Sequence, residues 1–158
     1  MNILAIDPGP VESAFVNWDG KEISGMGKVE NLRIFPEIYG LVEDGGILVV
    51  EKICSYGMAV GESVFETVFW SGRFCGFADD ADIKWTRMPR MDVKMHLCHT
   101  PRAKDSNIIQ ALVDRFATNE KNKGKGTKAS PGFFFGFRSD IWQAFALAVT
   151  YYDQNTPK

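Results

Sequence analysis

The chain has 158 residues, of which 45% are hydrophobic and 24% charged, and its formal net charge is −2. This length and composition predict a single globular domain over residues 1–158 with a sizeable core. No apolar run is long enough to span a membrane, and Cys54, Cys75 and Cys98 form no Cys-x-x-Cys pair. These features exclude a membrane-spanning protein, a disulfide framework and a zinc site. With no evident signal peptide, we expect a reducing, cytoplasmic location.

Two apolar runs of the first third each end in an acid. Residues 2–6 lead into Asp7, which Pro8-Gly9-Pro10 follows, and residues 46–50 lead into Glu51. Such runs predict buried strands. Taken alone, Asp7 is better explained as a turn aspartate that accepts hydrogen bonds from its own backbone. The repetition favours a second explanation, in which two neighbouring core strands deliver their carboxylates side by side.

The charges are unevenly distributed along the chain. Residues 1–83 carry 5 Lys/Arg and 14 Asp/Glu, whereas residues 84–128 carry 11 Lys/Arg and 4 Asp/Glu. A basic face for an anionic polymer explains this asymmetry, and so do lysines on solvated helices and a loop. Before the motifs are considered, the two explanations are equally good.

The remaining elements follow from apolar periodicity and turn residues. In chain order they are strands at 12–18 and 22–29, a helix at 31–41, a helix at 59–77, a strand at 82–88, helices at 91–98 and 105–116, and an apolar, buried helix from Ser139 to Val149. Residues 118–137, which we call the basic loop, are rich in Gly and Lys and predict a flexible segment. Their residue order excludes a Walker A phosphate loop, so no nucleotide cofactor is expected.

Three motifs, in this order, resemble the ribonuclease H-like nucleases, and most closely the RuvC-type Holliday-junction resolvases, particularly those of phages. They are Ile6-Asp7-Pro8-Gly9, Val50-Glu51-Lys52 and Asp140-Ile141-Trp142-Gln143-Ala144. Between the last two, Val93-Lys94 and Ala103-Lys104 resemble the segment in which such resolvases carry their active-site lysines. The resemblance implies an α/β fold with a mixed sheet of about five strands flanked by helices. It also implies a metal-dependent endodeoxyribonuclease that cleaves branched DNA and resolves four-way junctions by paired symmetric nicks. A phage-encoded chain of this kind would act in the host-cell cytoplasm.

The resemblance also implies the site residues. Asp7, Glu51 and Asp140 would be the catalytic metal ligands, and Lys94 and Lys104 would neutralise the scissile phosphate. Oxygen ligands without a Cys/His cluster select Mg²⁺, with Mn²⁺ as a substitute. As an alternative, Asp140 is simply an acid in the first turn of the last helix, where it suits the helix dipole.

The last helix departs from the family pattern at Gln143. The resolvases usually carry a second acid three residues after the first, and here that position is the amide Gln143. We expect Gln143, on the same helix face as Asp140, to be a neutral metal ligand or a water anchor. Asp105 is the candidate for a compensating acid.

The expected DNA contacts lie mainly in the basic part of the chain. Tyr56 either wedges into unstacked DNA or packs in the core. The basic candidates are Arg87, Arg90, Arg102, Lys121, Lys123, Lys125 and Lys128.

Paired incisions require two active sites, so the resemblance implies a two-fold homodimer. The candidate surface is the helix at 59–77, which has more large apolar side chains than one buried stripe needs. A thick core is the other explanation for them. Three alternatives remain for the function: a non-catalytic module that binds branched DNA, a nuclease that cuts forks or flaps, and an actin-like ATPase fold. The length of the chain argues against the last, because that fold needs two such domains.

Overall fold

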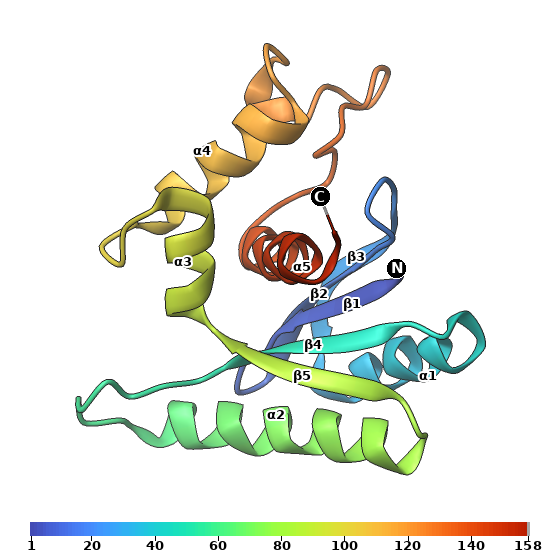
Figure 1. Cartoon of the computed structure of the whole chain (residues 1–158), viewed down its shortest axis with the longest axis vertical. Coiled ribbons are helices and arrows are strands. Elements are labelled where there is room, and N and C mark those ends of the chain that lie inside the picture. Colours follow the sequence, from blue (N-terminus) through green and yellow to red (C-terminus); the bar gives the residue numbers. More distant parts are fainter. Residues whose placement is uncertain (158) are drawn as a thin grey trace.

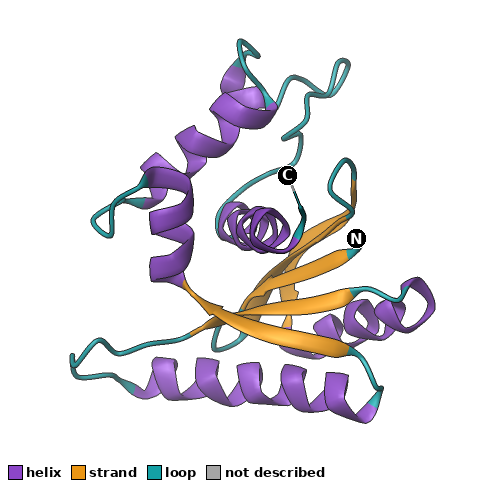
Figure 2. Cartoon of the chain, in the orientation of Figure 1, coloured by secondary structure: helices purple, strands orange, loops and turns teal. Residues whose placement is uncertain are grey.

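The computed structural model describes residues 1–157 and shows a five-stranded mixed sheet with helices on both faces (Figures 1 and 2). The strands are β1 (Ile3–Asp7), β2 (Glu12–Trp18), β3 (Ile23–Glu30), β4 (Ile47–Lys52) and β5 (Lys84–Pro89). The helices are α1 (Ile34–Asp44), α2 (Glu62–Asp80), α3 (Arg90–Cys98), α4 (Asp105–Phe116) and α5 (Ile141–Asn155), with short 3-10 turns at Asn31–Arg33 and Asn122–Gly124. The predicted α/β fold with a five-stranded sheet is confirmed.

The sheet has the order β3-β2-β1-β4-β5, so β1 lies at its centre. β1, β2 and β3 form an antiparallel meander, whereas β4 runs parallel to β1 and β5 runs parallel to β4. The register pairs Ile6 with Val50, which places Asp7 and Glu51 next to each other at the carboxyl ends of two parallel strands. This is the adjacency that the two acid-terminated runs predicted.

The two faces of the sheet carry separate cores. α5 packs against one face with α3 and α4 beyond it, and α1 and α2 cover the other face (Figure 1). Residues 141–150 of α5 are all buried, which explains why its sequence is apolar around the whole helix. Among residues 1–157, no helix is both long and apolar enough to cross a membrane.

The basic loop is tied to the α5 side of the molecule by its aromatic residues. Phe134 and Phe137 are buried in the core, and Phe133 stacks on Phe116 of α4 with ring centroids 5.2 Å apart. Gly124 has a positive φ of 73°, and a Cβ there would lie 2.3 Å from the Ala117 side chain. The loop therefore has a closely packed base, while Lys121, Lys123 and Lys128 are exposed.

Some predicted boundaries shift by a few residues. The helix expected at 59–77 begins and ends three residues later, at Glu62–Asp80. Ser139, from which the last helix was predicted to begin, lies outside it with a φ of 48°, and Asp140 holds the N-terminal cap position. Pro36 lies in the first turn of α1, where a proline costs no helical hydrogen bond.

Candidate functional site

The turn that follows Asp7 is held by a buried polar network. The Gly9 N–H donates to Ser13 Oγ at 3.1 Å, the Ser13 hydroxyl donates to Asn31 Oδ1 at 2.6 Å, and Asn31 Nδ2 donates to the Gly9 carbonyl at 3.0 Å. Only glycine fits at this turn, because a Cβ on Gly9 would lie 2.2 Å from the Glu12 carbonyl oxygen. The Gly9 N–H is thus committed to Ser13, so it does not serve Asp7 as in a simple aspartate turn.

Asp7 and Glu51 form a close acidic pair on the face of the sheet that α5 covers. Burial, the hydrogen bond with Glu51 and the negative charges of Glu51 and Asp140 raise the pKa of Asp7 to about 9, and Arg90 opposes this shift. Two carboxyl groups in contact cannot both be ionised cheaply, so Asp7 keeps its proton unless a cation joins the pair. The pair is therefore a strong candidate for cation binding.

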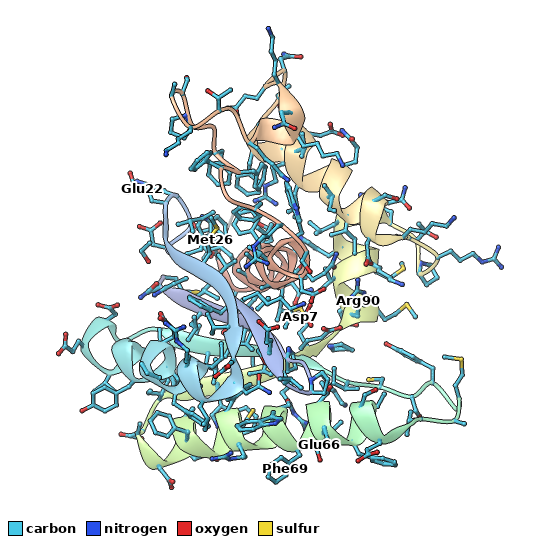
Figure 3. The ribbon with its side chains drawn as sticks, turned by 180° about the vertical axis from the view of Figure 1, so that it is seen from behind. Asp7, Glu22, Met26, Glu66, Phe69 and Arg90 are labelled. Carbon is cyan, nitrogen blue, oxygen red and sulfur yellow. The ribbon has the colours of Figure 1, made fainter. Side chains whose placement is uncertain are left out.

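Arg90, the first residue of α3, lies beside this pair. Its guanidinium nitrogen is 3.9 Å from Glu51 Oε1, and it also contacts the exposed carboxylate of Asp105. Figure 3 shows Asp7 and Arg90 close together where the sheet meets α3. Gln143, which is 8% exposed, borders the same place. A small cavity is lined there by Glu51, Arg90, Val93, Gln143 and Leu147.

Asp140 is engaged by a lysine from the opposite edge of the sheet. Lys28 Nζ on β3 donates to Asp140 Oδ2 at 2.7 Å, and this bond raises the pKa of Lys28. Asp140 holds the N-terminal cap position of α5, but its side chain accepts no hydrogen bond from a backbone N–H of that helix and binds Lys28 instead. Asp140 nevertheless lies near enough to Asp7 for its charge to contribute to the raised pKa there.

A divalent cation fits the acidic pair better than it fits all three acids together. Among residues 1–157, no three carboxylate, histidine or cysteine side chains converge closely enough to form a metal-ion site. Asp7 and Glu51 do meet and offer only oxygen atoms, the donors that Mg²⁺ and Mn²⁺ prefer. The predicted ligand set of Asp7, Glu51, Asp140 and Gln143 stays a prediction, with its first two members already in contact.

The two predicted catalytic lysines lie on the α3–α4 side of the site. Lys94 is half-buried one helical turn after Arg90, so both side chains lie along one face of α3. Lys104 is exposed just before α4, where its backbone N–H donates to Asn107 Oδ1 at 2.8 Å. It directly precedes Asp105, the partner of Arg90. Of the cations on this side, Arg90, which was predicted only as a DNA contact, lies nearest to the acids.

The other predicted DNA contacts are scattered over the molecule. Arg87 pairs in register with Val50, whose side chain lies in the core on the α1–α2 face, so Arg87 faces away from Asp7. Arg102 is exposed in the turn between α3 and α4. Tyr56 is 59% exposed in the loop between β4 and α2, which excludes the core-packing alternative. In the basic loop, Lys125 is half-buried and the other three lysines are exposed.

Sequence reasoning missed Lys28 as well as the buried network that holds the Asp7 turn. One sequence signal brings Lys28 near the site, because Asp19-Gly20 is a typical hairpin turn. Counting outward from this turn along both strands places Lys28 within one residue of the position opposite Ala14, and Ala14 in turn lies opposite Asp7. His96 contacts Asp153 at 2.7 Å, near the C-terminal end of α5. Asp153 also accepts two hydrogen bonds from Arg115 and takes no part in the acidic site.

No protein-family model and no curated protein sequence matches the chain. Solved structures do. A structure of Thermus thermophilus RuvC is 18% identical, covers 98% of this chain and 96% of its own, and has a TM-score of 0.68. T. thermophilus RuvC in complex with a Holliday junction substrate is 16% identical, covers 95% of this chain and 92% of its own, and has a TM-score of 0.67. The chain therefore has the ribonuclease H-like fold of the RuvC-type resolvases.

Proposed function

We propose that this chain is a metal-dependent endodeoxyribonuclease that cleaves branched DNA and resolves four-way junctions by paired symmetric nicks. The observation that carries the proposal is the buried contact between Asp7 and Glu51 at the carboxyl ends of two parallel strands. The fold supports it, because 95–98% of the chain matches structures of T. thermophilus RuvC, one of them in complex with a Holliday junction substrate.

In this proposal Asp7 and Glu51 hold a Mg²⁺ ion, for which Mn²⁺ can substitute. When bound, such an ion supplies an activated water and charge stabilisation for phosphodiester hydrolysis. Gln143 borders the same cavity as Glu51 and is suited to hold a water molecule through its amide. Arg90, with Lys94 and Lys104 beyond it, would neutralise the scissile phosphate from the α3 side.

Branched DNA would then lie across the basic part of the chain. Residues 84–128 contain 11 of the 18 Lys and Arg residues, and they include α3, α4 and the start of the basic loop. The exposed side chains of Arg102 and the basic-loop lysines suit contacts with the phosphate backbone. The exposed Tyr56 extends from the loop that directly follows β4, close to the acidic pair in sequence, and suits stacking on an unpaired base.

Paired nicks require a second active site, and α2 offers a surface for a homodimer. Phe65, Val68 and Phe69, which we call the α2 patch, are 64%, 46% and 58% exposed. They lie three and four residues apart and so share one helix face, and Figure 3 shows Phe69 pointing away from the molecule. The sheet-facing residues of α2 include Thr67, Ser71 and Phe74 instead. A thick core therefore does not explain the α2 patch, and a second copy of the chain would cover it.

The test is cleavage of a panel of DNA substrates: a four-way junction, a fork, a flap and a linear duplex, each with Mg²⁺ or with EDTA. We expect Mg²⁺-dependent cleavage of the four-way junction at symmetric positions on opposing strands. Preferred cleavage of forks or flaps would show that the chain is a simpler structure-selective nuclease and not a junction resolvase. Binding of the junction without cleavage in either Mg²⁺ or Mn²⁺ would show a non-catalytic DNA-binding module.

A further inference from the structure

We propose that the ammonium group of Lys28 takes the place of a second metal ion beside Asp140, so that the chain binds a single divalent cation, at Asp7 and Glu51. This inference rests on the proposed function, because it assumes that the acidic pair binds a metal ion. It assigns a role to Lys28, which was not among the residues predicted for the site.

The first observation is the contact itself. Lys28 Nζ and Asp140 Oδ2 are 2.7 Å apart, and the two residues are separated by 112 positions in the chain. The lysine side chain is 26% exposed and the Asp140 side chain 48% exposed, so the pair is shielded from water on the lysine side only. A cation at this distance opposes the approach of a divalent ion to the same carboxylate, because like charges repel strongly in partly buried surroundings.

The second observation is the register of the sheet. Lys28 pairs with Ala14, Ala14 pairs with Asp7, and Asp7 lies beside Glu51, so these residues form one row across four strands on the α5 face. Within this row, the side chain between Lys28 and Asp7 is the methyl group of Ala14. The long lysine stem can therefore extend over β2 toward the acidic pair, as the contact with Asp140 requires.

The third observation is the distribution of charge. Arg90 lies 3.9 Å from Glu51 on one side of the site, and Lys28 binds Asp140 on the other side. Gln143, one helical turn after Asp140, is neutral and adds no charge to attract a second divalent ion. Of the three acids, Asp7 and Glu51 form a close pair that needs a cation. Asp140 is a single carboxylate that is already paired with Lys28.

Lys28 would therefore supply fixed positive charge where a second metal ion would otherwise bind. A lysine ammonium binds phosphate oxygens as a point charge, so it can neutralise the substrate phosphate without a further ion. Unlike a metal ion, this charge is always present and does not depend on the concentration of free Mg²⁺.

The experiment counts Mn²⁺ ions bound to the DNA-free chain, by equilibrium dialysis and by calorimetric titration. We expect one Mn²⁺ per wild-type chain, two for Lys28→Met, and one again for the double variant Lys28→Met/Asp140→Asn. Lys28→Arg keeps the positive charge and should bind one. The matched control is Lys21→Met, which removes an exposed lysine of the β2–β3 turn and should also bind one.

The outcomes separate this inference from the proposed function. One Mn²⁺ on Lys28→Met, or two on the wild type, would overturn the role of Lys28 while leaving a metal-binding acidic pair. No Mn²⁺ on the wild type, or undiminished binding to Asp7→Asn, would overturn the proposed metal site itself. Circular dichroism of each variant establishes that the ion counts refer to folded protein.

Discussion

The acidic pair should make the metal-free protein less stable as the pH rises, and Asp7→Asn should remove this dependence. Burial and Glu51 raise the pKa of Asp7 to about 9 in the folded chain, against about 3.9 for an unfolded aspartate. Between these two values the folded state keeps a proton that the unfolded chain has lost, so stability falls with rising pH. An asparagine at this position donates its N–H to Glu51 at every pH, as the protonated aspartic acid does.

The size of the effect follows from the same shift. Each pKa unit corresponds to about 1.4 kcal/mol. Across roughly three pH units, from about pH 5 to about pH 8, the free energy of unfolding attributable to Asp7 falls by up to about 4 kcal/mol. Because the charges of Asp7 and Glu51 are coupled, we expect a fall of about 2–4 kcal/mol.

The assay is urea unfolding in EDTA at both pH values, with wild type, Asp7→Asn and the control Asp80→Asn, an exposed acid at the end of α2. From the lower to the higher pH, the free energy of unfolding of the wild type should fall by about 2–4 kcal/mol more than that of Asp7→Asn. The reason is that only the wild type carries the proton on Asp7. Asp80→Asn should follow the wild type. A difference below about 1 kcal/mol between the wild type and Asp7→Asn would show that Asp7 and Glu51 are not coupled as the structure indicates.

Three further predictions concern other parts of the molecule. Replacing the four basic-loop lysines by glutamine should reduce the slope of log K against log salt for DNA binding by up to about four, because each lysine that contacts a phosphate releases about one counterion. An unchanged slope would show that the basic loop does not contact the DNA backbone. Phe69→Glu in the α2 patch should convert a dimer into a monomer of 17.7 kDa in equilibrium sedimentation, and a wild type already monomeric with and without junction DNA would contradict the dimer. Phe134→Ala should cost about 3–5 kcal/mol in urea unfolding, because Phe134 is fully buried; a loss below about 1 kcal/mol would mean that the base of the basic loop is not part of the core.

The strands and helices were largely predictable because hydrophobic pattern and burial agree in this chain. The apolar runs before Asp7 and Glu51 became β1 and β4, and the apolar last helix became the fully buried α5. Helix α2 is harder to orient from its sequence, because it carries large apolar residues on both faces: Phe74 is buried against the sheet, whereas Phe65 and Phe69 are exposed. Periodicity identifies a helix, but when both of its faces carry apolar residues it does not say which one is buried.

The partner of Asp140 was not predictable for a specific geometric reason. The β2–β3 hairpin begins with Trp18 opposite Ile23, and a bulge next to Trp18 then shifts the register so that Ala14 lies opposite Lys28. Without that extra residue Ala14 would pair with Gly27, and Lys28 would point to the other face of the sheet. A one-residue irregularity, which leaves no mark in the sequence pattern, thus decides whether a cation reaches the acidic site.

The most direct measurement is single-turnover cleavage of a four-way junction by the wild type and by Asp7→Asn, each in Mg²⁺ and each with its junction affinity measured in parallel. Our account predicts symmetric cleavage by the wild type, and for Asp7→Asn a loss of at least about a hundredfold in rate, since even residues that only support metal ligands cost up to that much. Junction binding by Asp7→Asn should stay within a few-fold of the wild type, and Asp80→Asn should cut at the parent rate. Cleavage by Asp7→Asn at the wild-type rate would contradict the assignment of the acidic pair as the catalytic centre.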